Sequence, residues 1–285
     1  MKMLQRGIRG FLLLMISGSL LGVAAASHAQ AVTTTPAAPN AYEPFVLTFL
    51  ACGIDKPVDV YVFADSLLVK ANEADGFLCG AVEKTASIEG LPSGTYSVGL
   101  SEYLTPGGDY LEDSTPRALG SVTVAPAPAT VRVFAFYNLS IGHYFITAGT
   151  AEKDSLVSSG AGGWSMVDAG FRAWPAAGPA PAAAKPVCRF YSFTVNSHFY
   201  TAGPNECELL KQPGSGWTYE GIAFRALVPT KGSCYPGTTP VWRLYNDRFA
   251  QSDSNHRFVT SADTYRHMIA NGWVGEGVAF CSPPA

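Results

Sequence analysis

One nine-residue phrase recurs in this chain, and its recurrence most limits the possible folds. GWTYEGIAF occupies residues 216–224, GWVGEGVAF occupies residues 272–280, and a fainter version, GWSMVDAGF, occupies residues 163–171. In all three the Trp and the closing Phe stand seven residues apart. Self-similarity of this kind is typical of repeat architectures. The second half of the chain is therefore expected to contain copies of one structural unit.

The residues before each phrase follow a common order. A first strand is predicted around three tyrosines that fall 54 residues apart both times: Tyr137, Tyr191 and Tyr245. Second strands are predicted at 143–147, 197–201 and 256–260, and short helices at 151–159, 204–212 and 262–271. Gly-Trp then opens a last strand. The unit is strand, strand, helix, strand, and its copies span about 131–176, 185–230 and 238–285 within a domain at 131–285.

The preceding part of the chain predicts a small β-sandwich at residues 45–125. FVLTFLAC, VDVYVFAD, TYSVGLSE and ALGSVTVA are short β-branched or aromatic runs, separated by turn residues. Residues 31–44 are rich in Thr, Pro and Ala and are expected to form a mobile linker. Because three small units cannot each bury a face alone, they should pack around a pseudo-threefold axis. The predicted fold is a β-rich α+β fold, an N-terminal β-sandwich followed by this three-repeat domain.

Residues 1–30 have the pattern of a secretory signal peptide. Lys2, Arg6 and Arg9 precede the apolar run GFLLLMISGSLLGVAAA, and small residues follow. Cleavage there would export the protein to the periplasm or beyond the cell. No later run is long enough to span a membrane, so no membrane insertion is expected after cleavage.

The net charge disfavours two classes of partner. The leader carries three positive charges and no acids, so its removal changes the formal charge from −3 to −6. A nucleic-acid partner would need a basic face, and anionic lipid would need a basic surface as well. We expect neither partner.

Six cysteines follow the leader, and an even number in an exported chain favours disulfides. Six cysteines allow fifteen pairings, and the sequence does not choose among them. Position within domains and repeats suggests three pairs: Cys52–Cys79, Cys188–Cys207 and Cys234–Cys281.

Three histidines in the second strands raise the possibility of a metal site. Counted back from Thr147, Thr201 and Thr260, the first and third histidines, His143 and His256, lie at minus four, whereas the second, His198, lies at minus three. A slip of one residue points a strand side chain to the opposite face. We therefore expect no metal site and no cofactor.

Glu220 and Glu276 occupy matching places in the second and third phrases. A pair of glutamates can hydrolyse a glycosidic bond, but these two would lie on related, rotated surfaces. Each precedes a Gly, which suits a turn or bulge. Arg189 and Arg243 also occupy matching places, and they could contact a ligand or equally pair with the two glutamates.

Two further features are candidates for binding. The loop at 247–255 gathers Asp247, Asp253 and Asn255, an oxygen-rich set that calcium favours, although a solvated loop is the preferred interpretation. Tyr200 and Tyr219 break the repeat pattern and are expected to be exposed. The recurring tryptophans are expected to pack in the core.

The repeats resemble a known family. Y-R-[FL]-Y-N, then H-F-Y-T, then G-W-x-x-E-G-[IV]-A-F is similar to a bacterial secreted tandem-repeat family of unknown function, often attached to exported hydrolases. The resemblance covers about residues 131–285, and the first copy departs from it with Val167 in place of the glutamate. The resemblance implies a non-catalytic accessory or binding role, toward carbohydrate or the cell envelope.

These observations predict a secreted, non-catalytic recognition module that binds a glycan or cell-envelope polymer. No G-x-S-x-G, H-E-x-x-H or glycine-rich phosphate loop occurs, so we expect no enzyme. The alternatives are a protein-binding or adhesion module and a glycoside hydrolase that uses Glu220 or Glu276. The candidate ligand-binding residues are Arg189, Tyr200, Tyr219, Glu220, Arg243, Asp253, His256 and Glu276.

Overall fold

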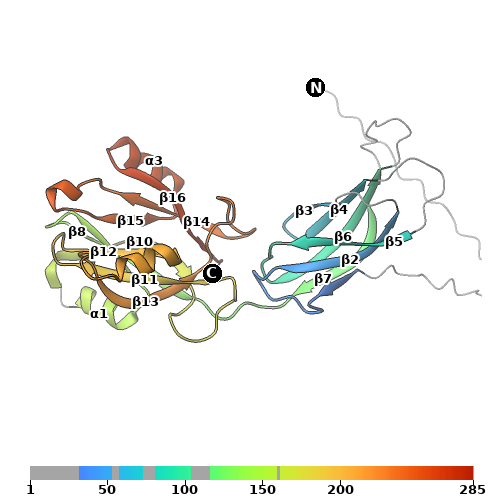
Figure 1. Ribbon diagram of the computed structural model, residues 1–285, viewed down its shortest axis with the longest axis horizontal. Helices are drawn as coiled ribbons and strands as arrows, with labels where there is room; N and C mark the ends of the chain where they lie inside the picture. Colours follow the sequence, from blue (N-terminus) through green and yellow to red (C-terminus); the bar gives the residue numbers. More distant parts are fainter. Residues whose placement is uncertain (1–31, 53–57, 73–80, 104–115, 159–160, 285) are drawn as a thin grey trace, which may run out of the picture.

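The computed structural model describes residues 32–52, 58–72, 81–103, 116–158 and 161–284. The predicted leader lies outside this range, and so does Cys79 of the predicted Cys52–Cys79 pair. Within the range the chain forms a β-sandwich and a second, three-part β-rich body that carries three short helices (Figure 1).

The sandwich consists of two sheets. The first has the order β1-β2-β5, and the second has the order β3-β4-β6-β7, in which β4 and β6 run parallel. Their bounds are β1 Thr33–Thr35, β2 Phe45–Cys52, β3 Val58–Val62, β4 Ser66–Asn72, β5 Ala81–Ile88, β6 Gly94–Tyr103 and β7 Arg117–Val124. Along β2, Phe45, Leu47 and Phe49 are buried, and this alternation gives one face to the core between the sheets.

The described residues of the predicted linker at 31–44 pack against the β-sandwich. Thr33–Thr35 pairs with β2, and Ala41 and Tyr42 are buried in the core. The Tyr42 backbone N–H donates to the Leu91 carbonyl oxygen at 2.7 Å. The prediction of a mobile linker is therefore wrong for its described residues, because an aromatic side chain inside the Thr/Pro/Ala run anchors it.

The second body repeats one unit three times, as predicted. Each unit is an antiparallel three-stranded sheet whose first strand lies in the middle: β10-β8-β9, β12-β11-β13 and β15-β14-β16. The strands are β8 Val131–Asn138, β9 His143–Thr147, β10 Trp164–Ala173, β11 Lys185–Ser192, β12 Ser197–Thr201, β13 Thr218–Ala226, β14 Thr239–Tyr245, β15 His256–Val259 and β16 Val274–Ser282.

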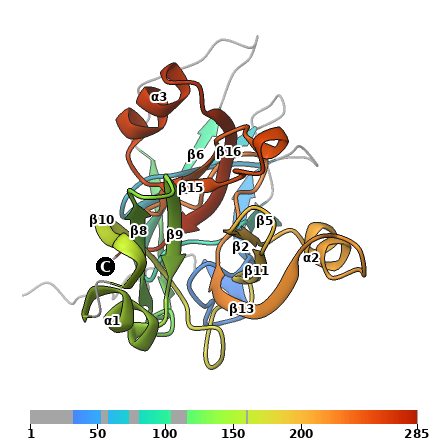
Figure 2. The ribbon, with the colours of Figure 1, turned by 90° about the vertical axis from the view of Figure 1, so that its left-hand side faces the viewer.

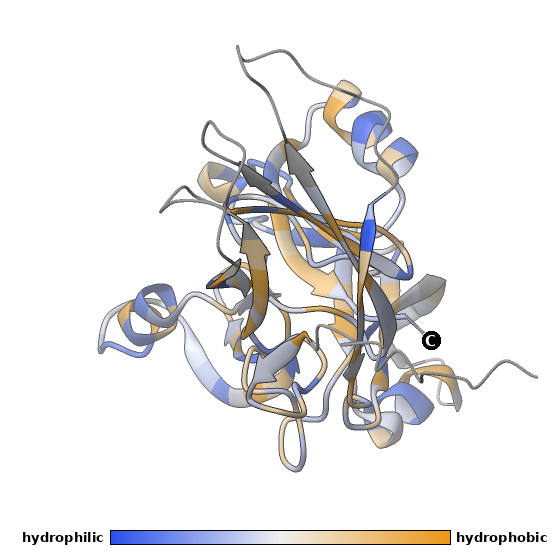
Figure 3. Ribbon diagram, turned by 90° about the vertical axis from the view of Figure 1, so that its right-hand side faces the viewer, coloured by the Kyte–Doolittle hydropathy of each residue, from blue (hydrophilic) through white to orange (hydrophobic). Residues whose placement is uncertain are grey.

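One helix connects the second and third strands of each unit: α1 Thr150–Ser158, α2 Pro204–Leu210 and α3 Ala262–Ala270. Two 3-10 turns lie at Ala161–Gly163 and Phe249–Gln251. Figure 2 looks along the repeated body and shows the helices spread around its outside, with the strands within. Figure 3 shows hydrophilic and hydrophobic residues mixed on the outer helices, and Cys207 of α2 and Met268 of α3 are buried.

Equivalent side chains from the three repeats meet in one core. Val133, Val187 and Val241 are fully buried. The closing phenylalanines of the recurring phrase contact one another, with ring centroids 5.6 Å apart for Phe171–Phe224, 6.0 Å for Phe171–Phe280 and 5.6 Å for Phe224–Phe280. The repetition in sequence is thus explained by packing, because each copy supplies the same residues to a shared pseudo-threefold core.

A polar cluster joins the second strands of the three repeats. His143, Ser197 and Asn255 are buried. The Asn255 side-chain amide donates to Ser197 Oγ at 2.9 Å and to the Tyr144 carbonyl oxygen at 3.1 Å, and its oxygen accepts from the Tyr144 N–H at 2.7 Å. Asn255 therefore belongs to the interior, not to a solvated loop.

Two of the suggested disulfides are present, Cys188–Cys207 and Cys234–Cys281. Disulfides persist mainly in oxidising compartments, so they are compatible with an exported protein. Within the described ranges no helix is long and apolar enough to cross a membrane.

The sandwich and the repeats share a buried contact. Trp174, at the end of the first repeat, is fully buried and lies edge-on to Tyr42, with ring centroids 6.0 Å apart. Its indole N–H donates to the Pro128 carbonyl oxygen in the connecting segment at 2.9 Å. Tyr235, in the segment between the second and third repeats, also contacts Tyr42.

Candidate functional site

A β-bulge places Glu220 beside Arg189. In the β11/β13 pairing Arg189 lies opposite Gly221 and Phe190 lies opposite Tyr219, so Glu220 is the extra residue between them. Gly221 has φ +117°, a region that suits glycine. Bulges redirect side chains, and here Glu220 Oε2 lies 2.8 Å from Arg189 Nε. The prediction of a bulge is confirmed, and so is the alternative that the arginine pairs with the glutamate.

The same arginine reaches into the neighbouring repeat. Arg189 Nη1 donates to Glu152 Oε2 at 2.9 Å and to Oε1 at 3.2 Å. Glu152 lies in the first turn of α1, in the first repeat. His198 completes the group, with Nε2 3.4 Å from Glu220 Oε2. The cluster thus spans the boundary between the first and second repeats.

The boundary between the second and third repeats carries a matching cluster. Arg243 Nε donates to Glu276 Oε2 at 2.8 Å, and Arg243 Nη1 lies 3.7 Å from Oε2 of Glu206, in the first turn of α2. His256 Nε2 lies 3.4 Å from Glu276 Oε2. The arrangement of Arg, two Glu and His therefore occurs twice.

Burial keeps both histidines uncharged near neutral pH. Burial, with the Arg189 charge beside it, lowers the pKa of His198 to about 4, although Glu152 opposes this shift. Burial and Arg243 lower the pKa of His256 to about 3. The contacts with Glu220 and Glu276 are thus made by neutral imidazoles, and each arginine carries the positive charge of its cluster.

The boundary between the third and first repeats has different chemistry. Ala135 takes the place of the arginine, and Tyr144 takes the place of the histidine, opposite Tyr137 in the β8/β9 pairing. The Arg257 guanidinium lies over the Tyr144 ring, 4.3 Å from its centroid, and donates to the Tyr144 hydroxyl at 3.1 Å. The Trp273 ring packs edge-on to Tyr144.

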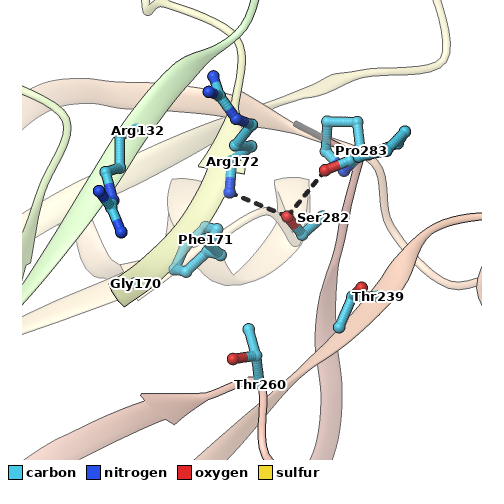
Figure 4. A pocket seen from close by; sticks show the side chains of 9 residues that line it. Arg132, Gly170, Phe171, Arg172, Thr239, Thr260, Ser282 and Pro283 are labelled. Carbon is cyan, nitrogen blue, oxygen red and sulfur yellow. Dashed lines mark hydrogen bonds between the residues drawn. The ribbon is translucent and has the colours of Figure 1, made fainter. Parts of the chain in front are cut away.

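Two boundaries are hollowed. Between the first and second repeats a hollow of about 160 Å³ is lined by Thr147–Gly149, Glu152, Arg189 and Glu220–Ala223. Between the third and first repeats a larger hollow of about 410 Å³ is lined by Arg132, Gly170–Arg172, Thr239, Thr260 and Ser282–Pro284 (Figure 4).

A family model described as "Domain of unknown function (DUF5648)" matches residues 132–283, which is more than half of the chain. The chain belongs to this family. The match covers the three repeats and so agrees with the expected resemblance to an uncharacterised family. No curated protein and no solved structure matches the chain.

The structure corrects the histidine register in the DUF5648 domain. His198 lies opposite Tyr191, and His256 lies opposite Tyr245, so the two histidines are equivalent. His143 lies opposite Asn138, one residue away. Counting from Thr260 gave the wrong register because that residue follows β15, and Val259 takes the place of Thr201. No three His, Cys, Asp or Glu side chains within the described ranges are arranged to hold a metal ion.

The remaining candidates of the DUF5648 domain are Tyr200, Tyr219 and Asp253. Tyr200 is buried, contrary to expectation, and its hydroxyl donates to the Ile146 carbonyl oxygen. Tyr219 is 39% exposed, with the Lys211 ammonium 4.6 Å from its ring centroid. Asp253 lies 2.5 Å from His143 Nε2 and 2.6 Å from Arg248 Nε, so its carboxylate holds the long loop of the third repeat to the first repeat.

Sequence reasoning missed Glu152 and Glu206, and it considered His198 only as a metal ligand. A signal was present for the glutamates, because each stands five residues after a Thr-Ala-Gly triplet that begins at Thr147 or Thr201. Their role depends on an arginine of the next repeat, which no pattern within one copy reveals.

Proposed function

We propose that the chain is a non-catalytic recognition protein that binds glycan or cell-envelope polymer at the boundaries between its repeats. The observation that carries the proposal is the hollow between the first and second repeats. Carboxylates from Glu152 and Glu220 and the guanidinium of Arg189 all line it. Sugar hydroxyls both donate and accept hydrogen bonds, and a wall with carboxylate acceptors and guanidinium donors matches them.

The size of the hollow favours a small group over a large one. Its 160 Å³ lies below the usual range for drug-sized ligands, so a single sugar unit or chain end is the expected occupant. The half-exposed Tyr219, next to Glu220 in sequence, offers a ring on which a neighbouring sugar could stack. The resemblance to secreted repeats that accompany exported hydrolases supports the same role.

A pull-down tests this proposal. The chain without residues 1–30, and residues 131–285 alone, are incubated with insoluble peptidoglycan, chitin and cellulose and with a soluble glycan array. We expect binding by both forms and a loss of at least fivefold in Glu152→Gln and in Tyr219→Ala. Glu208→Gln is the matched control, because Glu208 is exposed on α2 and pairs with Lys211. Binding to no glycan would contradict the proposal.

A protein-binding module is the second candidate, and exposed apolar side chains favour it. Leu139 and Phe193 are 81% exposed, and Phe249 is 71% exposed. Each lies in the segment between the first and second strands of its repeat. Saturable binding to a purified protein, with no glycan bound, would favour this role. Glycan turnover that Glu220→Gln or Glu276→Gln abolishes would instead favour a hydrolase.

A further inference from the structure

The residues that line the smaller hollow, between the first and second repeats, recur between the second and third repeats. Strand pairing fixes which positions are equivalent. Eight of the nine lining residues have an identical counterpart, and the ninth pair is Ile222 with Val278. The identical pairs are Thr147 with Thr201, Ala148 with Ala202, Gly149 with Gly203, Glu152 with Glu206, Arg189 with Arg243, Glu220 with Glu276, Gly221 with Gly277 and Ala223 with Ala279.

The backbone that carries these residues also matches at the two boundaries. Thr147 Oγ1 accepts a hydrogen bond from the Gly149 N–H at 2.9 Å, and Thr201 Oγ1 accepts one from the Gly203 N–H at 2.9 Å. The bulges that carry the second glutamate agree as well, because their glycines have φ values of +117° and +84°. The side chains of the two sets therefore start from equivalent backbone positions.

The charged groups make the same contacts in both sets. The arginine Nε lies 2.8 Å from Oε2 of the bulge glutamate, and the histidine Nε2 lies 3.4 Å from the same oxygen. One contact is longer, because Arg189 lies 2.9 Å from Glu152 whereas Arg243 lies 3.7 Å from Glu206. The four glutamate side chains are 27% to 43% exposed. Both boundaries thus offer a ligand the same accessible carboxylates beside one guanidinium.

The boundary between the third and first repeats does not carry this set. In the same register Ala135 takes the place of the arginine, Val167 that of the bulge glutamate and Thr264 that of the helix glutamate. Tyr144 and Arg257 pack against each other there instead. Because one boundary forms with different residues, the packing of repeats does not by itself require an arginine and two glutamates.

We propose that the boundary between the second and third repeats is a second saccharide site, so that one chain binds two units of a repeating glycan. This inference rests on the proposed function and adds the position of the second site and the class of ligand. Two equal sites on one molecule strengthen binding only to a ligand that presents the same unit more than once, because the second contact then forms at a high effective concentration. The expected ligand is therefore a polymer of repeated units.

Titration calorimetry on the chain without residues 1–30 counts the sites. The titrants are soluble units of the three insoluble polymers: chitotriose, cellotriose and the disaccharide of N-acetylglucosamine and N-acetylmuramic acid. The parent should bind two molecules of the recognised titrant per chain. Glu152→Gln and Glu206→Gln should each leave one site of unchanged affinity, because only the other site loses a carboxylate. The double variant should bind none.

Thr264→Ala is the matched control, because Thr264 occupies the place of Glu152 and Glu206 in the third repeat. It should leave both sites in place. Glu206→Gln should fold as the parent does, because an ion pair at 3.7 Å with a carboxylate side chain 43% exposed contributes little to stability. Its effect on binding can therefore be separated from an effect on folding.

Retention on the insoluble polymers gives a second measurement. On the polymer that retains the parent, Glu206→Gln should weaken binding at least about fivefold, through the loss of simultaneous contact at two sites. Equal retention of Glu206→Gln and the parent, or one site per chain in the parent, would overturn the inference and leave the proposed function in place. Binding of no titrant together with retention on no polymer would overturn both.

Discussion

At the scale of single residues, the partly buried His198 and His256 decide how the repeats respond to acid. His198 and His256 each lie between an arginine and aromatic rings: Phe145 and Tyr191 contact His198, while Phe199 and Tyr245 contact His256. A proton on either imidazole would be desolvated and repelled by Arg189 or Arg243. The same burial that packs the repeats therefore excludes the charged form of both histidines.

Stability should fall as the pH decreases from neutral. The folded-state pKa values, about 4 for His198 and about 3 for His256, lie below the unfolded value of about 6.5. The unfolded chain then binds more protons below pH 6.5, and each histidine lowers the free energy of unfolding by about 1.4 kcal/mol per pH unit. That loss continues until the pH reaches the folded-state pKa.

Urea unfolding between pH 7.5 and pH 5 measures this effect. His256→Gln should reduce the loss of stability between pH 6.5 and pH 5 by about 2 kcal/mol, whatever its effect at pH 7.5. His267→Gln is the control, because His267 is exposed on α3. An unchanged pH slope in His256→Gln would show that folding does not lower the pKa of His256.

At the scale of the elements, the bulges in the third strands set the chemistry of the boundaries. Glu276 and Gly277 form the bulge in β16 opposite Arg243, as Glu220 and Gly221 do in β13. Gly277 has φ +84°, and no atom lies within 4 Å of where a Cβ would stand. Glycine is thus favoured at position 277 because of the backbone conformation, and not because a side chain would lack space. Gly170 in β10 differs, because a Cβ there would meet the Val133 carbonyl oxygen at 1.8 Å.

Replacing these glycines by alanine should therefore have unequal effects. Gly277→Ala should lower the free energy of unfolding by about 1–2 kcal/mol, the cost of a left-handed conformation for an L-residue. Gly170→Ala should cost considerably more, because the strand backbone must move. Urea denaturation of both variants measures the difference. Equal losses would mean that β10 can shift away from β8 as easily as β16 tolerates a side chain.

Several elements could be predicted from the sequence, and the reasons for the failures are physical. The run FVLTFLAC coincides with β2 because its alternating apolar residues meet the core. β4 and β5 were missed because Lys70, Glu83 and Lys84 interrupt their apolar pattern. Strand pairing, not spacing from one threonine, fixes the register of His198 and His256.

Of the contacts that form the candidate site, only those within one repeat could be predicted from the sequence. The pairs Arg189–Glu220 and Arg243–Glu276 lie on adjacent strands of one sheet, so matching positions in the copies pointed to them. Glu152 and Glu206 come from the preceding repeat, and the larger hollow is lined by the third and first repeats. Contacts between repeats depend on how the copies pack, which the pattern within one copy does not specify.

At the scale of the whole molecule, Trp174 connects the sandwich to the repeats. Its ring is buried against Tyr42, and its indole N–H is bonded to Pro128 in the connecting segment. Loss of a buried Trp side chain typically costs 3–5 kcal/mol. We therefore expect the contact between the sandwich and the repeats to depend more on the Trp174 side chain than on the length of the connecting segment.

Limited proteolysis tests that dependence. Trp174→Ala should expose residues 125–130 and accelerate cleavage there, separating the sandwich from the repeats. Trp217→Ala is the comparison, because Trp217 packs on Phe199 within its own repeat. It should destabilise the second repeat without directing cleavage to the connecting segment. Identical cleavage patterns in the two variants would show that Trp174 does not hold the two bodies together.

The pseudo-threefold core has a consequence for how such a protein can diversify. A ring of three identical subunits has the same interface three times, so any substitution at one interface occurs at all three. Here the three copies are covalently joined, and all three share the central Val and Phe residues while their boundaries differ. Each boundary between repeats can therefore change on its own. Ala135, which takes the place of an arginine at the boundary between the third and first repeats, is an example. The chain therefore keeps the pseudo-threefold symmetry of its core, while the surfaces at its three boundaries are free to differ.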